Sequence, residues 1–301
     1  MTYENSLKEI ALADERYLVL TAENRAAIRN LPQALGERFI DTGITEQAMV
    51  GIAAGLALRG RIPVAHALAS FLTMRAFEFV RTDVGLPGLP VKLVGGVPGF
   101  LSEANGPTHQ ALEDVALMRG IPNMGVFCPA DEQDLLIGLP QVLASPQPFY
   151  IRHTPRPAVI DHEPIFALGQ AEQVTDGEDV TILTYGFLFE QAYEATRLLE
   201  SQGMSVRLLN LRTLKPVDEA AILQAARETD LLVTIEDHFI TGGLYSLVCE
   251  LLVRHQWLSR VLPLALDQRW FKPALLDEVL SHEGFSGPQI AQTISEALAK
   301  R

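Results

Sequence analysis

Residues 38–58 read RFIDTGITEQAMVGIAAGLAL, a stretch that passes from a short strand into a helix. A β-like run ends at Asp41, a turn with Gly43 follows, and an apolar pattern rich in Ala and Gly indicates a helix from Glu46 to Leu58. Glu46 therefore lies in the first helical turn, where the partial positive charge of the helix N-terminus stabilises a carboxylate. Taken by itself, this position is explained most simply by helix capping.

The composition excludes several classes of protein. With 301 residues and 48% hydrophobic content, the chain can bury one large core or two ordinary ones. The net charge of −13 is spread along the sequence, which argues against non-specific binding to nucleic acids or anionic membranes. Cys128 and Cys249 lie far apart without zinc-site spacing, as expected for buried thiols in a reducing compartment. The charged N-terminal segment lacks the apolar core of a signal peptide, and no apolar run is long enough to span a membrane. We therefore expect a soluble, cytoplasmic protein.

Strand-like and helical patterns alternate along the first half of the chain. The strand-like runs cover residues 17–21, 38–41, 63–68, 91–94 and 125–127, and the helical patterns cover 46–58, 70–83, 111–119 and 131–143. This alternation predicts a parallel sheet that is covered by helices on both faces.

A proline-rich region then interrupts the pattern. Six of the 18 prolines lie between residues 140 and 164, and proline removes a backbone donor and fixes φ, so this region indicates a connection. Alternation resumes with strand-like runs at 180–185, 206–209, 231–235 and 262–265, and helical patterns at 190–201, 217–228, 243–254 and 288–300. We therefore predict an α/β protein of two consecutive open, mostly parallel sheets with helices on both faces, divided into domains 1–162 and 163–301.

The loop 101–110, LSEANGPTHQ, is the first candidate for a binding site. It is long and rich in small residues, and it ends in a histidine, His109, just before a helix. Long loops at strand ends are where α/β folds bind ligands. A simple N-cap at Thr108 explains the same residues.

The segment 70–81 contains a possible apolar face. Its spacing places Phe71, Met74 and Phe77 on one side of a helix, an arrangement that usually packs in a core. No glycine-rich nucleotide loop, nucleophile elbow or HExxH zinc motif occurs in the chain.

A pair of glycines and a pair of arginines each have two possible roles. Gly242 and Gly243 follow the strand-like run at 231–235, and they allow a close approach to the backbone by a ligand or by a neighbouring subunit. Arg152 and Arg156 end the first domain, where they could bind an anionic substrate or form salt bridges.

Taken together and in order, the motifs of this chain resemble the transketolase family of thiamine-diphosphate enzymes. The matching segments are GITEQ with GIAAGLA (43–57), 63–71, RAFEFVR (75–81), GPTHQ (106–110), IPNM (121–124), PADE (129–132), LKP (214–216) and the EDH…GGL turn (236–244). The resemblance covers nearly the whole chain.

The resemblance implies that only the second part of such an enzyme is present. The domain with the Gly-Asp-Gly…Asn signature, which holds diphosphate and metal, is missing. Residues 1–162 would form the pyrimidine-binding domain and residues 163–301 the transketolase C-terminal domain. The family pattern thus implies a partner subunit that holds most of the diphosphate and the Mg²⁺ or Ca²⁺, in an α₂β₂ heterotetramer.

The resemblance also assigns roles to residues. Glu46 would lie against N1′ of the aminopyrimidine of thiamine diphosphate and activate it, and His109 would bind the substrate near the reacting carbon. Phe71 would stack on the pyrimidine ring, in a pocket lined by the apolar residues Ile44, Leu68, Met74 and Phe77.

The substrate side departs from the family pattern. Asn105 replaces an aspartate that contacts a sugar hydroxyl, and Val97 replaces a phosphate-binding histidine. Arg152 and Arg156 stay as candidates for binding an anion, although their spacing is one residue longer than usual. The cofactor half of the site therefore matches the family, and the donor need not be an ordinary sugar phosphate.

We accordingly expect the C-terminal subunit of a split transketolase-like enzyme, which moves a two-carbon ketol unit from a ketose to an aldose. The alternatives are the β subunit of a 2-oxo-acid dehydrogenase, an activity like that of deoxyxylulose-phosphate synthase, and a non-catalytic regulatory paralogue.

Overall fold

Seven strands form the first sheet of the computed structural model, which describes residues 1–300. Their order is β10-β5-β6-β4-β3-β1-β2, and every pair is parallel except β10 with β5. The strands are β1 (Tyr17–Thr21), β2 (Phe39–Asp41), β3 (Ile62–Leu68), β4 (Lys92–Gly96), β5 (Gly125–Phe127), β6 (Phe149–His153) and β10 (Thr213–Lys215).

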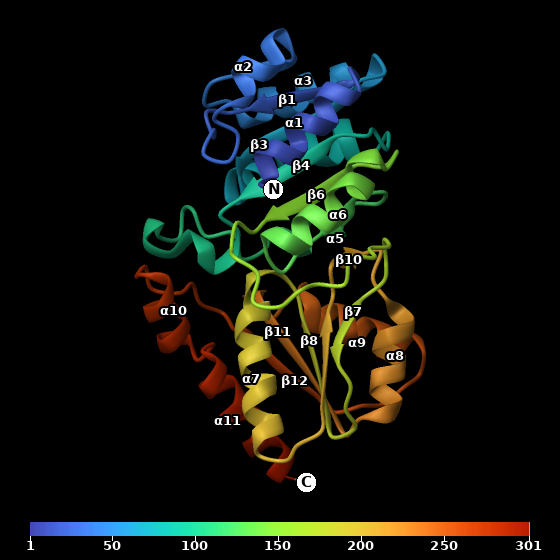
Figure 1. Cartoon of the computed structure of the whole chain (residues 1–301), viewed down its shortest axis with the longest axis vertical. Coiled ribbons are helices and arrows are strands. Elements are labelled where there is room, and N and C mark those ends of the chain that lie inside the picture. The colour runs from blue at the N-terminus through green and yellow to red at the C-terminus, as the bar shows by residue number, and fades with distance from the viewer. Residues whose placement is uncertain (301) are drawn as a thin grey trace.

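Helices cover this sheet, and the apolar strands are buried between them, as a parallel sheet requires (Figure 1). They are α1 (Tyr3–Ala13), α2 (Leu31–Leu35), α3 (Glu46–Leu58), α4 (Phe77–Phe79), α5 (Asp114–Arg119) and α6 (Glu132–Ala144), with shorter turns at Gly36–Arg38 and Gly99–Asn105.

The second sheet has five strands in the order β12-β11-β8-β9-β7, of which only β7 runs antiparallel to its neighbour. The strands are β7 (Glu172–Thr175), β8 (Val180–Thr184), β9 (Val206–Asn210), β11 (Leu231–Phe239) and β12 (Val261–Leu266). The helices are α7 (Phe189–Ser201), α8 (Glu219–Glu228), α9 (Leu244–Arg254), α10 (Leu276–Glu283) and α11 (Gly287–Ala299), with a short turn at Gly186–Leu188. Two mostly parallel sheets in an α/β fold confirm the predicted fold class.

The two units lie one above the other along the long axis of the molecule (Figure 1). They share structure, because β10 comes from the second half of the sequence and pairs with β5 at the edge of the first sheet. One buried hydrophobic cluster contains residues from both units, such as Val126 and Leu214. The division at residues 162 and 163 stays a prediction.

The segment after β3 differs from the single helix expected over residues 70–83. It forms a π-helical turn (η2, Phe71–Arg75), the short α4, and a second π-helical turn (η3, Val80–Gly85). In each turn the backbone bond spans five residues: the amide of Ala76 donates to the carbonyl of Phe71, and that of Leu86 to Arg81. Such turns insert an extra residue into a helix and are frequent at functional sites. The face predicted from a period of 3.6 residues is therefore split.

The Gly242–Gly243 turn makes its close approach to the chain itself. A Cβ atom on Gly243 would overlap the carboxylate of Glu236 on β11. That carboxylate accepts hydrogen bonds from the amides of Leu244 and Tyr245, at 2.6 and 2.9 Å, and so caps the N-terminus of α9. Within residues 1–300, none of the helices has the length and apolarity needed to cross a bilayer.

Candidate active site

Glu46 is the first residue of α3, and it is buried with 2% exposure. The turn before it is held by the hydroxyl of Thr45, which donates to the carbonyl of Thr42 at 2.8 Å. In the described part of the chain, the Glu46 carboxylate accepts no hydrogen bond from the amides of α3; its partner is Arg75, whose Nη1 lies 3.1 Å from Oε2. The capping interpretation is therefore not supported.

A cavity of about 340 Å³ adjoins this carboxylate, and we call it the glutamate pocket. It lies where β1 and β3 end and α3 begins, at the carboxyl edge of the sheet, where α/β folds bind ligands. Its lining residues are Ala22, Glu23, Asn24, Ile44, Glu46, Leu68 and Phe71. Three predicted cofactor-binding residues, Ile44, Leu68 and Phe71, therefore lie around the predicted catalytic glutamate.

Phe71 connects this pocket to the loop of residues 101–110, which we call the histidine loop. Its ring meets the His109 imidazole edge to face, with centroids 5.0 Å apart. The guanidinium carbon of Arg75 lies 4.0 Å from the centroid of the Phe71 ring. The Thr108 hydroxyl lies 2.9 Å from His109 Nδ1, so it orients the imidazole. Residues predicted from separate motifs thus meet around one aromatic ring.

A second cavity, of about 400 Å³, lies beside the histidine loop, and we call it the loop pocket. It shares Phe71 with the glutamate pocket and is lined as well by Ser70, Met74, Arg75, Pro107, Thr108, Gln110, Glu113 and Trp270. Met74 therefore faces the loop pocket. Phe77 lines neither cavity; it packs against the main hydrophobic cluster, because η2 ends the helical period before it.

The two positions at which the substrate side departs from the family pattern lie outside the glutamate pocket and the loop pocket. Asn105 is exposed at the end of the turn Gly99–Asn105 and lines neither cavity. Val97 has a left-handed backbone with φ of 56° and lines a separate cavity of about 310 Å³ with His153. Burial lowers the pKa of His153 to about 4, so this imidazole is neutral near pH 7.

Arg152 lines neither of these two cavities, and it forms salt bridges, which is one of the two roles that its sequence position left open. It is 1% exposed, and its Nε donates to Asp114 Oδ2 at 2.8 Å while Nη1 donates to Asp237 Oδ1 at 2.6 Å. It therefore ties α5 of the first unit to β11 of the second. Arg156 lies 3.4 Å from Glu190 at the surface, also outside both cavities.

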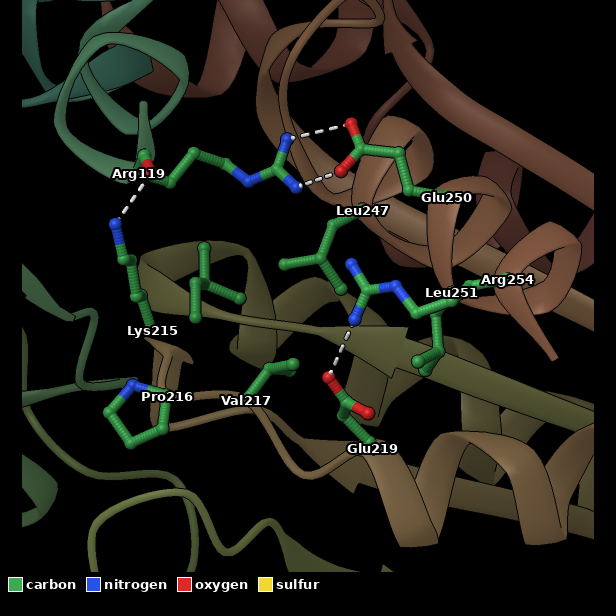
Figure 2. Close-up of a pocket in the computed structure, with 10 residues that line it drawn as sticks. Arg119, Lys215, Pro216, Val217, Glu219, Leu247, Glu250, Leu251 and Arg254 are labelled. Carbon is green, nitrogen blue, oxygen red and sulfur yellow. Dashed lines mark hydrogen bonds and ion pairs between the residues drawn. The ribbon is translucent and has the colours of Figure 1, made fainter. Parts of the chain in front are cut away.

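The chain has another pocket between the two units, of about 380 Å³ (Figure 2). Its charged groups already have partners: Arg119 forms two hydrogen bonds with Glu250, and Arg254 pairs with Glu219. Lys215 donates to the carbonyls of the α5 end, at Arg119 and Ile121. The charged side chains of this pocket are therefore engaged in contacts within the chain, many of which connect the two units.

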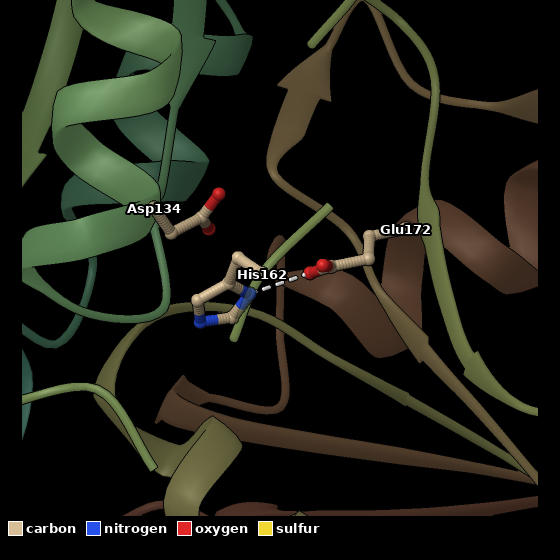
Figure 3. A group of neighbouring side chains, drawn as sticks. All are labelled: Asp134, His162 and Glu172. Carbon is tan, nitrogen blue, oxygen red and sulfur yellow. Dashed lines mark hydrogen bonds and ion pairs between the residues drawn. The ribbon is translucent and has the colours of Figure 1, made fainter. Parts of the chain in front are cut away.

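One cluster has the spacing of a metal site, formed by Asp134, His162 and Glu172 (Figure 3). His162 donates through Nδ1 to Glu172 and through Nε2 to Asp131, both at 2.7 Å. Burial by itself lowers the pKa of His162, but its hydrogen bonds to Asp131 and Glu172 outweigh this and raise the pKa to about 10. An imidazole that is protonated on both nitrogens cannot bind a metal, so the cluster is a salt-bridge network.

Sequence reasoning missed two residues of these cavities. Arg75 begins the RAFEFVR motif and lies four residues after Phe71 in the sequence, and this spacing of a cation and an aromatic residue is the signal that could have found it. Trp270 comes from the second unit, far away in sequence, and no local pattern predicts that it reaches the loop pocket.

Two family models match the chain. Residues 2–159 match the transketolase pyrimidine binding domain, and residues 169–290 match the transketolase C-terminal domain. The chain is 42% identical over 255 residues to the 6-deoxy-6-sulfo-D-fructose transketolase subunit SqwH of Clostridium sp. (strain MSTE9), which covers 83% of this chain and 79% of that protein.

Two further similarities differ in how much of the other protein this chain covers. The 1-deoxy-D-xylulose-5-phosphate synthase of Dictyoglomus thermophilum is 35% identical over 88% of this chain, but the match spans only 43% of that enzyme. A solved structure described as a split gene transketolase, inactive beta4 tetramer, superposes with a TM-score of 0.89 at 32% identity, covering 99% of this chain and 97% of that one. With both of its domains matched in order, this chain belongs to the transketolase family.

Proposed function

We propose that the chain is the C-terminal subunit of a split transketolase, which moves a two-carbon ketol unit from a ketose to an aldose with thiamine diphosphate. The observation that carries this proposal is the buried Glu46 carboxylate, which faces a pocket walled by Phe71 and joined through that ring to His109. Family membership and the similarity to split subunits over most of their length support it.

The pocket fits an aminopyrimidine ring. Arg75 places a planar cation against the Phe71 ring and donates a hydrogen bond to Glu46. A flat heterocycle with a donor at its edge would make the same two contacts. Ile44 and Leu68 would flank such a ring.

The roles of the residues follow from this fit. Bound thiamine diphosphate supplies the electron sink that allows a carbon–carbon bond of the ketose to break. Glu46 holds a proton at the ring nitrogen, and its position on a rigid helix keeps the carboxylate in place. Phe71 orients the ring and excludes water from its face. His109 donates or accepts a hydrogen bond at a substrate oxygen beside Phe71.

The site requires a second subunit. In residues 1–300, the group with metal-ligand spacing is the salt-bridge network around His162, which has no free ring nitrogen. We therefore assign the Mg²⁺ or Ca²⁺ and most of the diphosphate to an N-terminal partner, and we propose a cytoplasmic α₂β₂ heterotetramer.

The donor is proposed to lie outside the ordinary sugar phosphates. The relative SqwH is named for a sulfonated ketose, and Val97 occupies the place of a phosphate-binding histidine in the family pattern. A donor screen therefore needs sulfonated and unphosphorylated ketoses beside the phosphorylated ones.

Synthesis of a deoxyxylulose phosphate is the second candidate, because an enzyme of that name is 35% identical over 88% of this chain. That reaction joins a 2-oxo acid to an aldehyde with loss of carbon dioxide, so the products separate the two functions.

Reconstitution tests the proposal. An adjacent reading frame of about 270–300 residues, a typical size for such a unit, should encode the partner with its Gly-Asp-Gly…Asn signature. The pair should transfer ketol units, and Glu46→Ala should abolish turnover while the pair still assembles. The matched control is Glu78→Ala, which changes an exposed carboxylate on α4. Turnover by this chain with no partner, or full activity of Glu46→Ala, would refute the proposal.

A further inference from the structure

The loop pocket has one wall from the second unit. Among its described lining residues, Trp270 comes from the segment after β12, and all the others come from the first unit. Trp270 is 54% exposed, and its ring packs edge to face against Phe239 at 5.8 Å. A large aromatic side chain with half its surface open beside a cavity is available to a ligand.

Two hydrogen bonds tie the residues that follow Trp270 to the histidine loop. Gln110 Nε2 donates to the carbonyl of Phe271 at 3.0 Å, and the amide of Leu276 donates to Glu103 Oε2 at 2.9 Å. Phe271 itself is 1% exposed. These bonds hold the backbone that follows Trp270 against the histidine loop, so its side chain lies beside the loop pocket.

Two lining residues hold buried polar atoms that lack a partner. Ser70 Oγ and Gln110 Oε1 have no hydrogen bond within residues 1–300, and the two residues are 2% and 1% exposed. The amide nitrogen of Gln110 is already used by Phe271, so its oxygen stays as an acceptor. Buried polar atoms without partners are rare and need an explanation. Rotation of these two side chains toward the cavity would let the hydroxyl groups of a ligand satisfy both atoms.

The remaining lining adds charge of both signs. Arg75 supplies donors, and Glu113 supplies an acceptor that meets no cation in the described chain; burial, as the largest cause, raises its pKa. Donors and acceptors beside an aromatic face are the features that bind a polyhydroxylated carbon chain, whose C–H groups pack on the ring. A purely anionic ligand would instead require several free cations.

Because Phe71 lines both pockets, the loop pocket and the glutamate pocket adjoin at its ring. We propose that the loop pocket is the subsite for the hydroxylated tail of the ketose, and that Trp270 is a specificity-determining residue supplied by the C-terminal domain. This inference rests on the proposed function, and it gives the C-terminal domain a part in substrate choice.

The test uses the enzyme assembled with its partner. Trp270→Ala and Trp270→Phe are compared with wild type on a series of ketoses of increasing length, and on hydroxypyruvate, which has no hydroxylated tail. Leu275→Ala is the matched control, since Leu275 is 66% exposed on the same segment and does not line the pocket.

For Trp270→Ala we expect the KM of the long ketoses to rise about 3- to 10-fold, the size of a lost aromatic contact. Trp270→Phe should show a smaller rise, and Leu275→Ala none. Hydroxypyruvate kinetics, cofactor affinity and assembly should stay at wild-type values.

The results distinguish failure of the proposed subsite from failure of the proposed function. If the wild-type pair transfers ketol units but Trp270→Ala leaves the ketose series unchanged, or alters hydroxypyruvate equally, the subsite is refuted and the proposed function stands. If the wild-type pair cleaves no ketose, the proposed function fails and the subsite fails with it.

Discussion

Arg75 Nη1 lies 3.1 Å from Glu46 Oε2, so the buried carboxylate of the candidate site is paired with a cation in the free chain. The same guanidinium stacks on Phe71, at 4.0 Å from the ring centroid. These are the two contacts proposed for the aminopyrimidine, and both cannot occupy the site together. Under the proposed function, Arg75 would therefore move when thiamine diphosphate binds to the assembled enzyme.

Removal of this competitor should strengthen cofactor binding. In Arg75→Met, we expect thiamine diphosphate to bind the assembled pair about 2- to 5-fold more tightly, because a partly exposed ion pair and cation–π contact stabilise the free chain by roughly 1 kcal/mol or less. The Arg75 side chain is 43% exposed, so solvent screens the pair. Fluorescence titration with the cofactor measures this, and Arg75→Lys, which keeps the charge, should lie closer to wild type. Weaker binding by Arg75→Met would show that Arg75 holds the cofactor itself.

The substitution Glu46→Gln tests whether activity requires the carboxylate as a proton acceptor or only a side chain of the same size. The amide fills the same volume, but it cannot exchange a proton with the ring nitrogen. We expect kcat of the assembled pair to fall by about 10²- to 10⁴-fold, the usual contribution of general acid–base catalysis. Steady-state kinetics and size-exclusion chromatography provide the measurements. If kcat stayed within a factor of two, the proton-transfer role of Glu46 would be wrong.

His109→Ala should affect the donor more than the cofactor. The imidazole contacts Phe71 by its ring and the Thr108 hydroxyl by Nδ1, which orients it in the site. We expect kcat/KM for ketose donors to fall about 10-fold or more, as for a lost hydrogen bond to a reacting group, with little change in cofactor affinity. Thr108→Val is the matched control for orientation and should give a smaller loss. An unchanged donor kcat/KM would exclude His109 from substrate binding.

Local patterns predicted the fold class and the position of Glu46 at a helix start. These features depend on residues within one helical turn or one strand, and the periodicity of apolar residues in the sequence reveals such local structure. The interruption of the expected 70–83 helix by π turns was not predictable in this way, because the side chains of η2 follow an apolar spacing that an ordinary helix would also show. Because of this interruption, Phe77 packs against the main hydrophobic cluster, whereas Phe71 and Met74 line the loop pocket.

Long-range contacts determine the surroundings of the residues whose roles local reasoning left open or missed. The partners of Arg152 lie 38 and 85 residues away along the chain, at Asp114 and Asp237. A strand-end arginine gives no sign of whether it will face a ligand or a buried carboxylate. The bond that ties Gln110 to Phe271 spans 161 residues, so the contribution of Trp270 was equally invisible.

Arg152→Ala should destabilise the protein rather than weaken substrate binding. The change would leave Asp114 and Asp237 buried without their cation, and breaking a buried ion pair from one side typically costs about 3–5 kcal/mol. Urea denaturation of the isolated chain measures the loss. Arg156→Ala, at a partly exposed ion pair, is the matched control, and we expect it to change the free energy of unfolding by about 0.5 kcal/mol or less. A stable Arg152→Ala protein with a raised donor KM would instead restore the substrate role.

The salt-bridge network around His162 predicts a particular dependence of stability on pH. The folded pKa of about 10 lies above the value of 6.5 expected for an unfolded histidine. Between these values the folded state binds more protons than the unfolded state, so the stabilisation is complete below pH 6.5 and is lost as the pH rises to about 10. Lys92 acts in the opposite direction, because burial lowers its pKa to about 7.

A comparison of wild type with His162→Gln isolates the histidine, since the contribution of Lys92 is present in both proteins and cancels. Glutamine keeps a donor for Glu172 or Asp131 but carries no charge. We expect the difference in the free energy of unfolding to be largest near pH 6.5 and to shrink steadily toward pH 10. His255→Gln, at an exposed pair with Glu219, serves as the control and should show no such trend. A difference that stays constant across this range would mean that His162 is neutral in the folded state, and its ring nitrogens would then again be candidates for a metal.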